Sequence, residues 1–458
     1  MWSALYNLTD FLWGTPLMIL MIGVGLYLTA RVGFFQVTGI GLWVKKTLGE
    51  VFGKAGRKGG GNEGQLSPVQ ALSTVLAGTV GSGNIAGVAA AIAIGGPGAV
   101  FWMWVIAVVG MVTKMAEVSL AVAYRKKGEN GEYYGGPMHY MKQGLGKFGA
   151  VLAGVYAVAL FVEVCTDACF VQVNTLATCV NDVFGLPLIV SGLIVVISSF
   201  ILVQTGGVKK IGSFCEKFVP AMIGVYIIAC VGVVICNISQ VPAAFGMIFK
   251  YAFAPAPAIG GFAGSTISLT MGRGASRGIF SNESGMGTAT TVHATAQTDD
   301  PIHQGMYGIL EVFIDTIIIC TLTALTILCS GVWSNGNTGV VLTFDGFRTV
   351  WGTTGTIILC VAVILFTYSS YIGFFVEFRT CVEYLFGEKS IKFMKYLFFL
   401  LPLLSVILEV EQIWDLADMA VGFIVIPNMI ALAALSPKFT KMFKDYRAKC
   451  RQEKQIAD

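Results

Sequence analysis

Charged residues are scarce in this sequence. Asp, Glu, Lys and Arg make up 12% of its 458 residues, whereas soluble domains carry about 25%. Hydrophobic residues make up 55%, and the mean hydropathy is +0.75. This balance excludes a water-soluble enzyme, a disordered or collagen-like chain and a nucleic-acid-binding protein.

Long stretches carry no charge at all. Asp, Glu, Lys and Arg are absent from 11–30, 64–113, 183–208, 218–249, 251–272, 316–344, 349–376 and 419–437. About 20 apolar residues in a helix cross the hydrocarbon core of a bilayer. A transmembrane β-barrel would instead show alternating segments of about ten residues. The sequence therefore predicts an all-α polytopic membrane protein.

Eleven transmembrane helices fit these runs. We expect them at about 12–31, 67–94, 98–124, 148–180, 186–205, 211–236, 258–292, 301–330, 353–378, 393–411 and 413–436. The residues before the first helix include Asp10 but no Lys or Arg, which argues against a cleaved signal peptide.

The basic residues predict the orientation. With eleven helices, 25 of the 30 Lys and Arg residues fall in loops or a tail on one side, and only Lys250 and Arg348 fall on the other. Cytoplasmic loops carry the excess of Lys and Arg. We therefore expect a cell (inner or plasma) membrane protein with its N-terminus outside and a basic C-terminal tail inside, near acidic lipid headgroups. Nothing in the sequence indicates a nucleic-acid partner or an obligate protein partner.

Motifs for cofactors and metals are also missing. The three histidines, His139, His293 and His303, are scattered, and the eleven cysteines show no zinc-ligand pairing. The glycine-rich stretch 56–64 lacks the Gly-Lys-Ser/Thr of a phosphate-binding loop, and 81–87 has one residue too many for a dinucleotide fingerprint. We expect no enzyme activity and no resident cofactor.

Two predicted helices contain sequences that a simple membrane helix would avoid. One is 77–84, and the other is 271–278 continued by 280–285. Each interior glycine costs a helix about 1 kcal/mol relative to Ala, and non-helical backbone at membrane depth must be buried in protein or line a cavity. The alternative is close helix packing, because Gly83 and Gly87 also fit a Gly-x-x-x-Gly spacing.

The two predicted breaks lie five helices apart. Units of five helices have opposite topologies, and paired broken helices are typical of transporters with inverted repeats. We therefore expect one leading helix followed by a 5+5 inverted repeat. The expected parts are a leading helix with a glycine-rich link (1–66), two five-helix repeats (67–257 and 258–437) and a basic tail (438–458).

Several motifs are similar to those of one known family. The stretches 79–88, 95–104, 135–138, 277–285, 313–316 and 426–428 resemble the alanine/glycine:cation symporter family, the sodium:alanine symporters. The resemblance runs in order from about residue 10 to 437. It implies a leucine-transporter-like fold and sodium-driven uptake of a small amino acid by alternating access.

The first break offers a place for the substrate. Free amides at the start of a helix attract a carboxylate, so we assign this role to Ser82 and Gly83, with the Thr79 hydroxyl nearby; a merely flexible hinge is the alternative. The resemblance places sodium between the carbonyls of Ala77 and Val80 and the hydroxyls of Ser369 and Ser370. A hydroxyl pair in a membrane helix more often bonds back to its own helix.

Further residues are expected to contact the substrate. The resemblance makes Gln172 a candidate ligand, and Ser370 and Asn282 are further candidates. Asn174 matches another polar position of the family, and packing between helices is the alternative role for it. The family usually has Trp where this chain has Phe374, which enlarges the pocket and removes an N–H donor. Positions 168, 169 and 375–379 also depart from the family pattern.

Charged residues inside the predicted helices need partners, because a charge at the bilayer centre costs about 2.5–3.5 kcal/mol. We expect Lys114 to pair with Glu117 one turn away. Glu283 is expected to pair with Arg277 or Arg273, with direct binding of a ligand as the alternative. Glu163 and Asp167 are interpreted as cavity-edge carboxylates, with proton coupling or binding of a cationic substrate group as the alternative.

The sequence therefore predicts a sodium-coupled symporter that imports a small neutral amino acid resembling alanine or glycine. The alternative is a proton-coupled amino-acid transporter with a different or larger substrate, which would use Asp167 or Glu163. A channel would need a continuous polar lining, which these apolar helices do not suggest. A membrane enzyme would need converging His, Asp or Cys side chains, which the sequence does not indicate.

Overall fold

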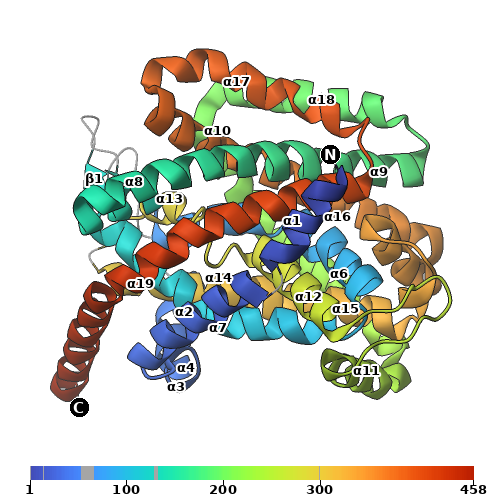
Figure 1. Cartoon of the computed structure of the whole chain (residues 1–458), viewed down its shortest axis with the longest axis horizontal. Helices are drawn as coiled ribbons and strands as arrows, with labels where there is room; N and C mark the ends of the chain where they lie inside the picture. Colours follow the sequence, from blue (N-terminus) through green and yellow to red (C-terminus); the bar gives the residue numbers. More distant parts are fainter. Residues whose placement is uncertain (1, 14, 53–65, 128–132, 299, 458) are drawn as a thin grey trace.

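The computed structural model describes residues 2–457 apart from 14, 53–65, 128–132 and 299. Helices account for nearly all of the regular structure in these residues (Figure 1). The strands β1 (Lys126–Lys127) and β2 (Tyr133–Tyr134) form a short antiparallel pair in which Lys126 lies opposite Tyr134. The prediction of an all-α protein is confirmed.

The N-terminal part forms the leading span. Its helices are α1 (Trp2–Trp13) and α2 (Thr15–Arg31), followed by α3 (Phe35–Thr38) and α4 (Ile40–Phe52). The chain turns between α2 and α3 at Gly33 and Phe34, which both have positive φ angles. The glycine-rich link predicted to follow lies mostly outside the described residues.

The next elements run through the first predicted break. They are α5 (Pro68–Thr79), η1 (Gly83–Gly87), α6 (Val88–Gly95), α7 (Ala99–Ala123), α8 (Pro137–Thr166), η2 (Asp167–Gln172), α9 (Val173–Phe184), α10 (Leu188–Cys236), η3 (Ile238–Gln240) and α11 (Val241–Phe253). Ser67 and Gln70 form a capping box that begins α5, with Pro68 at its first position. The chain bends by 50° between α5 and the helical segment 83–95. The predicted break at 77–84 is confirmed.

The remaining elements form the second half. They are α12 (Ile267–Asn282), α13 (Thr290–His293), α14 (Pro301–Val312), η4 (Phe313–Cys320), α15 (Thr321–Cys329), η5 (Val332–Ser334), α16 (Gly339–Phe386), η6 (Glu388–Ser390), α17 (Ile391–Leu400), α18 (Pro402–Ser405) and α19 (Val410–Ala457). In Figure 1, α19 runs along α8, and its C-terminal end projects from the lower left of the bundle.

The second break lies in the last part of the predicted stretch, within 280–285, and not in 271–278. Residues 271–282 are helical, and the backbone leaves α12 at Glu283, which has a φ of 54°. The glycines of α12 serve close packing instead. A Cβ at Gly274 would overlap the Ala99 carbonyl oxygen, and one at Gly278 would lie 3.4 Å from the Met103 Cα atom of α7. The packing explanation of such glycines is therefore correct for α12.

Other boundaries also differ from the prediction. The backbone stays helical from 188 to 236, where a loop was expected at 206–217, and α11 occupies a stretch that was expected to be a loop. The predicted tail is the end of α19 rather than a separate segment. Within the described residues, seven helices are long and apolar enough to cross a membrane, or eight if the bent pair 68–95 is one span. The count of eleven stays a prediction.

The packing brings the first break to the centre of the bundle. Helix α7 packs against α2, α12 and α14, and α16 packs against α5, η1, α8, η2, α9 and α10. Large apolar side chains remain on the outside, including Val151 at 69% exposure, Ile228 at 73% and Phe393 at 77%. An apolar exterior of this kind matches lipid chains, as a multi-pass membrane protein requires.

Candidate functional site

The first break frees two backbone carbonyls. In a continuous α-helix the amides of Gly81 and Ser82 would bond the carbonyls of Ala77 and Gly78. Here the Gly81 amide donates to the side chain of Asn84 (3.0 Å), and the Ser82 amide donates to that of Gln172 (3.3 Å). The two carbonyl oxygens therefore point to other partners inside the protein.

Two serines of α16 approach these carbonyls. The Ser370 hydroxyl donates to the carbonyls of Ala77 (3.0 Å) and Gly78 (2.9 Å). The Ser369 hydroxyl donates to the Phe366 carbonyl (2.9 Å) and lies 3.5 Å from the Ala77 oxygen. A Cβ at Gly81 would lie 2.5 Å from the Ser370 Oγ atom, so α16 can approach this closely only because residue 81 is glycine.

The structure thus brings together three of the four predicted sodium ligands, Ala77, Ser369 and Ser370. The fourth, Val80, is buried at the break with a ψ of 85°, while both serine hydroxyls donate to other carbonyls. Carbonyl and hydroxyl oxygens are hard ligands of the kind that non-transition cations prefer. The oxygen set fits a small cation.

Gln172 connects the break to η2. Its side-chain oxygen accepts the Ser82 amide, and its Nε2 atom donates to Asp167 at 2.9 Å. Asp167–Gln172 has π-helical geometry, which often occurs at functional sites. Asn174, on the adjoining α9, instead donates to the Ser405 carbonyl of α18, in agreement with the packing role.

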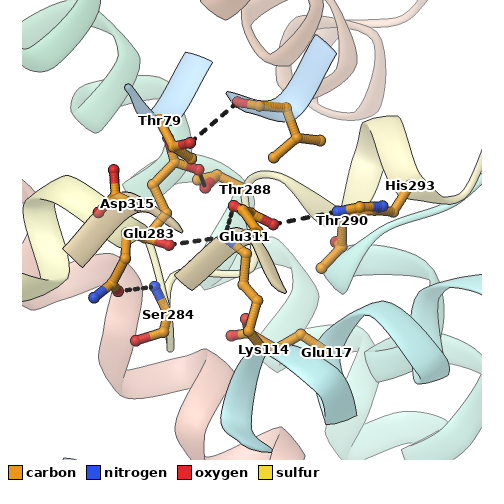
Figure 2. A network of polar contacts seen from close by, with 12 residues as sticks. Thr79, Lys114, Glu117, Glu283, Ser284, Thr288, Thr290, His293, Glu311 and Asp315 are labelled. Carbon is orange, nitrogen blue, oxygen red and sulfur yellow. Dashed lines mark hydrogen bonds and ion pairs between the residues drawn. The ribbon is translucent and has the colours of Figure 1, made fainter. Parts of the chain in front are cut away.

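Two other predicted substrate ligands, Thr79 and Gly83, lie at the break, and Phe374 lies on α16. The Thr79 hydroxyl donates back to the Val75 carbonyl at 3.3 Å (Figure 2). A Cβ at Gly83 would lie 3.0 Å from the Ser281 Cα atom, so η1 packs closely on the end of α12. Phe374 lies one turn after Ser370 and is 2% exposed.

Asp315 in η4 joins the two halves of the molecule. This fully buried carboxylate accepts hydrogen bonds from Asn84 Nδ2 (2.6 Å), Ser281 Oγ (2.7 Å) and Thr316 Oγ1 (2.8 Å). Asn84 lies after the first break, and Ser281 lies just before the second. Asp315 therefore connects the residues beside both breaks through hydrogen bonds to one carboxylate.

Asn282 belongs to this second group rather than to the first break. Its side chain donates to Thr316 Oγ1 (2.9 Å) and accepts the amide of Ser284 (2.9 Å). Its carbonyl accepts a hydrogen bond from Lys114 Nζ at 3.0 Å. The side-chain bonds hold Asn282 where the backbone leaves α12, so it stabilises the second break directly.

A buried ion-pair network lies beside that break (Figure 2). Lys114 Nζ is 2.9 Å from Glu311 Oε1, and Glu311 Oε2 is 3.2 Å from His293 Nε2. The ammonium group also caps the C-terminal end of α12, where a positive charge is favourable. Gln304 lies 2.9 Å from His293 Nδ1 and holds the ring in place.

Both predicted ion pairs are wrong. Lys114 pairs with Glu311, and Glu117 instead accepts a hydrogen bond from Asn428 of α19 at 2.5 Å. Glu283 bonds to the Thr288 hydroxyl. The partners of Lys114 and Glu117 lie on other helices, where sequence spacing gives no guide to them, and Thr288 lies in the turn that follows α12.

The arginines of α12 bond to α19. Arg277 pairs with Asp418 and lies over the Trp414 ring, with 4.2 Å from its guanidinium carbon to the ring centre. Arg273 is 3.4 Å from Asp418 and 3.8 Å from Asp415. A buried pair of this kind is costly to break from one side, so these contacts hold α12 against α19.

Comparison with known proteins agrees with this architecture. The sequence model of the sodium:alanine symporter family matches residues 1–458. The chain belongs to this family. The uncharacterised transporter YflA of Bacillus subtilis is 40% identical over 96% of this chain and 92% of its own length. The sodium/alanine symporter AgcS of Methanococcus maripaludis is 35% identical, over 97% and 98%. A protein named "Probable sodium/glutamine symporter GlnT" of Bacillus subtilis is 36% identical, over 95% and 89%.

A solved structure shares the fold of this symporter. MhsT, solved in complex with L-phenylalanine, superposes with a TM-score of 0.57 over 84% of this chain and 99% of that one, at 14% identity. This likeness shows the leucine-transporter-like fold alone. Together with the family, it makes the symporter a multi-pass, cation-coupled amino-acid transporter and not an enzyme.

Sequence reasoning missed the residues that connect the helices of the symporter. Asp315, Glu311 and Asp418 received no predicted role, although each interrupts an apolar stretch. An ionisable residue inside a membrane helix is a functional candidate by default, and this signal was available for all three. Their partners could not be predicted from the sequence, because they lie far away in the chain. Asn84, for example, is 231 residues from Asp315.

Proposed function

We propose that the transporter is a sodium-coupled symporter that imports a small neutral amino acid resembling alanine or glycine across the cell membrane. The proposal includes alternating access, an outside N-terminus, a cytoplasmic C-terminus, the repeats 67–257 and 258–437, and no resident cofactor. The names of AgcS and GlnT support sodium coupling and a neutral amino acid. The observation that carries the proposal is the oxygen cluster at the first break.

Sodium would bind between α5 and α16. Its ligands would be the Ala77 carbonyl and the hydroxyls of Ser369 and Ser370, with the Val80 carbonyl completing the set. The serine hydroxyls now donate to carbonyls, and their lone pairs would turn to the ion once it binds. Because the ion would join the two helices, its binding would fix the break in one shape.

The substrate carboxylate would bind at the Ser82 amide. The side-chain oxygen of Gln172 accepts that amide at 3.3 Å, and it occupies the position that a carboxylate oxygen would take. The positive end of the following helical segment favours the negative charge. Ligand binding would therefore exchange the Gln172 contact for a charged one, while Thr79, Gly83, Ser370, Asn282 and Phe374 would shape the remaining pocket.

Sodium and substrate would be coupled through the backbone of the first break, from Ala77 to Ser82. The carbonyls of Ala77 and Val80 would provide oxygens to the cation side, and the Ser82 amide would bind the substrate carboxylate. Fixing the carbonyls with sodium would orient this amide for the carboxylate. Sharing this backbone would be the physical reason for each ligand to raise the affinity for the other.

Uptake into proteoliposomes tests the proposal. A panel of labelled amino acids is offered with an inward sodium gradient, and then with sodium replaced by choline. We expect accumulation of alanine or glycine that needs sodium. Sodium-independent uptake that rises at acid pH would overturn sodium coupling in favour of the proton-coupled alternative, and uptake of only larger amino acids would overturn the substrate assignment.

Ser370→Ala tests the cation site itself. Loss of one oxygen ligand should raise the sodium concentration for half-maximal uptake by about tenfold, equivalent to about 1.4 kcal/mol. Thr380→Val is the matched control, because its hydroxyl lies on the same helix and bonds back to Val376 at 2.9 Å. An unchanged sodium dependence in Ser370→Ala would contradict the assignment.

A further inference from the structure

Three buried carboxyl groups lie near the substrate site. Glu163 is on α8, Asp167 begins η2 one turn later, and Glu377 is on α16. Their exposed fractions are 0%, 2% and 7%. Phe161 and Phe378 pack ring to ring with centroids 5.8 Å apart, which places the α8 and α16 segments against each other. The three groups therefore share one region of the interior.

The carboxyl group of Glu163 has no hydrogen-bond partner in the described part of the chain. Neither of its carboxyl oxygens has a hydrogen-bond partner among the described residues, and the same holds for Glu377 Oε2. Asp167 is different, because it accepts a hydrogen bond from Gln172 at 2.9 Å. The charges that act on Glu163 come from Asp167, Glu377 and Glu283, and all are negative.

The nearby cations are already engaged. Arg277 acts on Asp167 and Lys114 acts on Glu377. Arg277, however, is paired with Asp418, and Lys114 with Glu311. Removing a carboxylate from water without a counter-ion costs several kcal/mol. A buried carboxyl group in these surroundings needs a proton or a bound cation to be neutral.

The three carboxyl groups do not form a cluster of the kind that holds a metal ion. In the part of the chain that the structure describes, no group of three or more His, Cys, Asp or Glu side chains is arranged to hold one. A proton needs only one oxygen and no coordination shell. The unpartnered oxygens of Glu163 meet that condition.

We infer that Glu163 is a proton-binding site of this transporter, with Glu377 and Asp167 as its acidic neighbours. Binding forms an O–H bond on the Glu163 carboxylate with a proton taken from hydronium, which leaves water; release reverses the step. Asp167, Gln172 and the Ser82 amide form a hydrogen-bonded connection from this cluster to the first break. The other titratable side chains around the cluster are Tyr156, Cys165, Cys169 and Cys381.

The connection suggests how the proton affects transport. Protonation of Glu163 removes one negative charge beside Asp167. The repulsion between two neighbouring carboxylates is then absent, and it no longer opposes the hydrogen bond between Asp167 and Gln172. The substrate carboxylate, itself negative, would then enter a less acidic region. This consequence rests on the proposed function, whereas proton binding by Glu163 does not.

Infrared spectroscopy tests the proton site without any substrate. The full-length protein in lipid bilayers is titrated, and the C=O band of protonated carboxyl groups is compared between wild type and Glu163→Gln. We expect a band that persists at neutral pH in the wild type and loses the contribution of one carboxyl group in Glu163→Gln, a variant that keeps the shape of the neutral acid. Glu383→Gln, an exposed position on α16, should keep the band. Identical spectra for wild type and Glu163→Gln at neutral pH would overturn the inference.

Transport separates this inference from the proposed function. A pH dye inside proteoliposomes reports whether substrate entry acidifies the lumen, while labelled amino acid reports uptake. We expect acidification in the wild type and in Glu383→Gln, and uptake without acidification in Glu163→Gln. Acidification that survives in Glu163→Gln would overturn a transport role for the proton. A sodium-independent wild type that still acidifies would overturn sodium coupling alone.

Discussion

At the scale of residues, the first break depends on side chains that replace backbone partners. Asn84 and Gln172 each accept one amide that a continuous helix would use. Ser370 then takes up the two released carbonyls. Because Gly81 leaves no side chain between the helices, these three polar residues meet in a small volume. The break is therefore a specified structure rather than a weak point in the helix.

Phe374→Trp tests whether the aromatic ring one turn after Ser370 sets substrate size. The position is 2% exposed, so a larger ring must take space from its surroundings. We expect uptake of large neutral amino acids to fall about tenfold or more relative to alanine, because a small change in an apolar pocket is worth about 1–3 kcal/mol. Competition of labelled alanine uptake by a size series of amino acids measures this.

Phe393→Trp is the control for that change, because Phe393 is 77% exposed on the outer surface of α17. It should leave the order of competitors unchanged. If Phe374→Trp also leaves the order unchanged, Phe374 does not line the pocket.

At the scale of elements, apolar length predicted where most helices lie. The expected helix 98–124 corresponds to α7 (Ala99–Ala123), and 301–330 corresponds to the elements from Pro301 to Cys329. The glycines of α12 misled the prediction, because glycine permits both a break and close packing. Only the position of Ala99 against Gly274 decides between them, and no local pattern contains that contact.

The candidate site was predictable to a similar extent. Ser370 and Ala77 lie 293 residues apart, and only the family resemblance could place them together. Ion-pair partners were predicted from spacing along one helix, which failed for Lys114 because its partner Glu311 is on α14. Spacing describes neighbours on a helix surface, whereas a buried charge takes whichever partner the packing provides.

Asp315→Asn tests the connection between the two breaks. The carboxylate accepts three hydrogen bonds, and each bond to a charged group is worth about 1.5–3 kcal/mol. An amide keeps the shape but loses the charge and part of the acceptor capacity. We expect maximal uptake to fall about tenfold or more while the protein remains folded, because Asn84 and Ser281 would no longer be held together.

Uptake rate and thermal unfolding of Asp315→Asn are measured side by side, with Asp445→Asn on the exposed end of α19 as the control. Normal uptake in Asp315→Asn would show that the two breaks act independently of this link. Loss of folding with no active fraction would instead make Asp315 a stability residue.

At the scale of the whole molecule, the exterior is apolar and the C-terminal end of α19 is basic. Beside the end of α2, the last turns of α19 border an open pocket of about 450 Å³. It is lined by Val32, Gly33, Phe35, Thr38, Phe443, Lys444, Arg447, Ala448 and Arg451. Three of these side chains are basic and none is acidic. Such a pocket at the end of a span suits the phosphate of an anionic lipid headgroup.

Neutralising the pocket should therefore weaken stabilisation by anionic lipid. Each Lys or Arg near a charged membrane surface contributes about 1 kcal/mol, so the combined changes Lys444→Gln, Arg447→Gln and Arg451→Gln remove about 3 kcal/mol of attraction. We expect the rise in melting temperature from phosphatidylcholine to phosphatidylglycerol bilayers to be lost. The same loss of charge at Lys126, Lys127 and Lys142, which are also exposed, should leave that rise intact. An equal loss of this rise in melting temperature in both variants would mean that general surface charge, rather than this pocket, holds the lipid. If inorganic phosphate reproduces the rise in melting temperature, the pocket binds free anions.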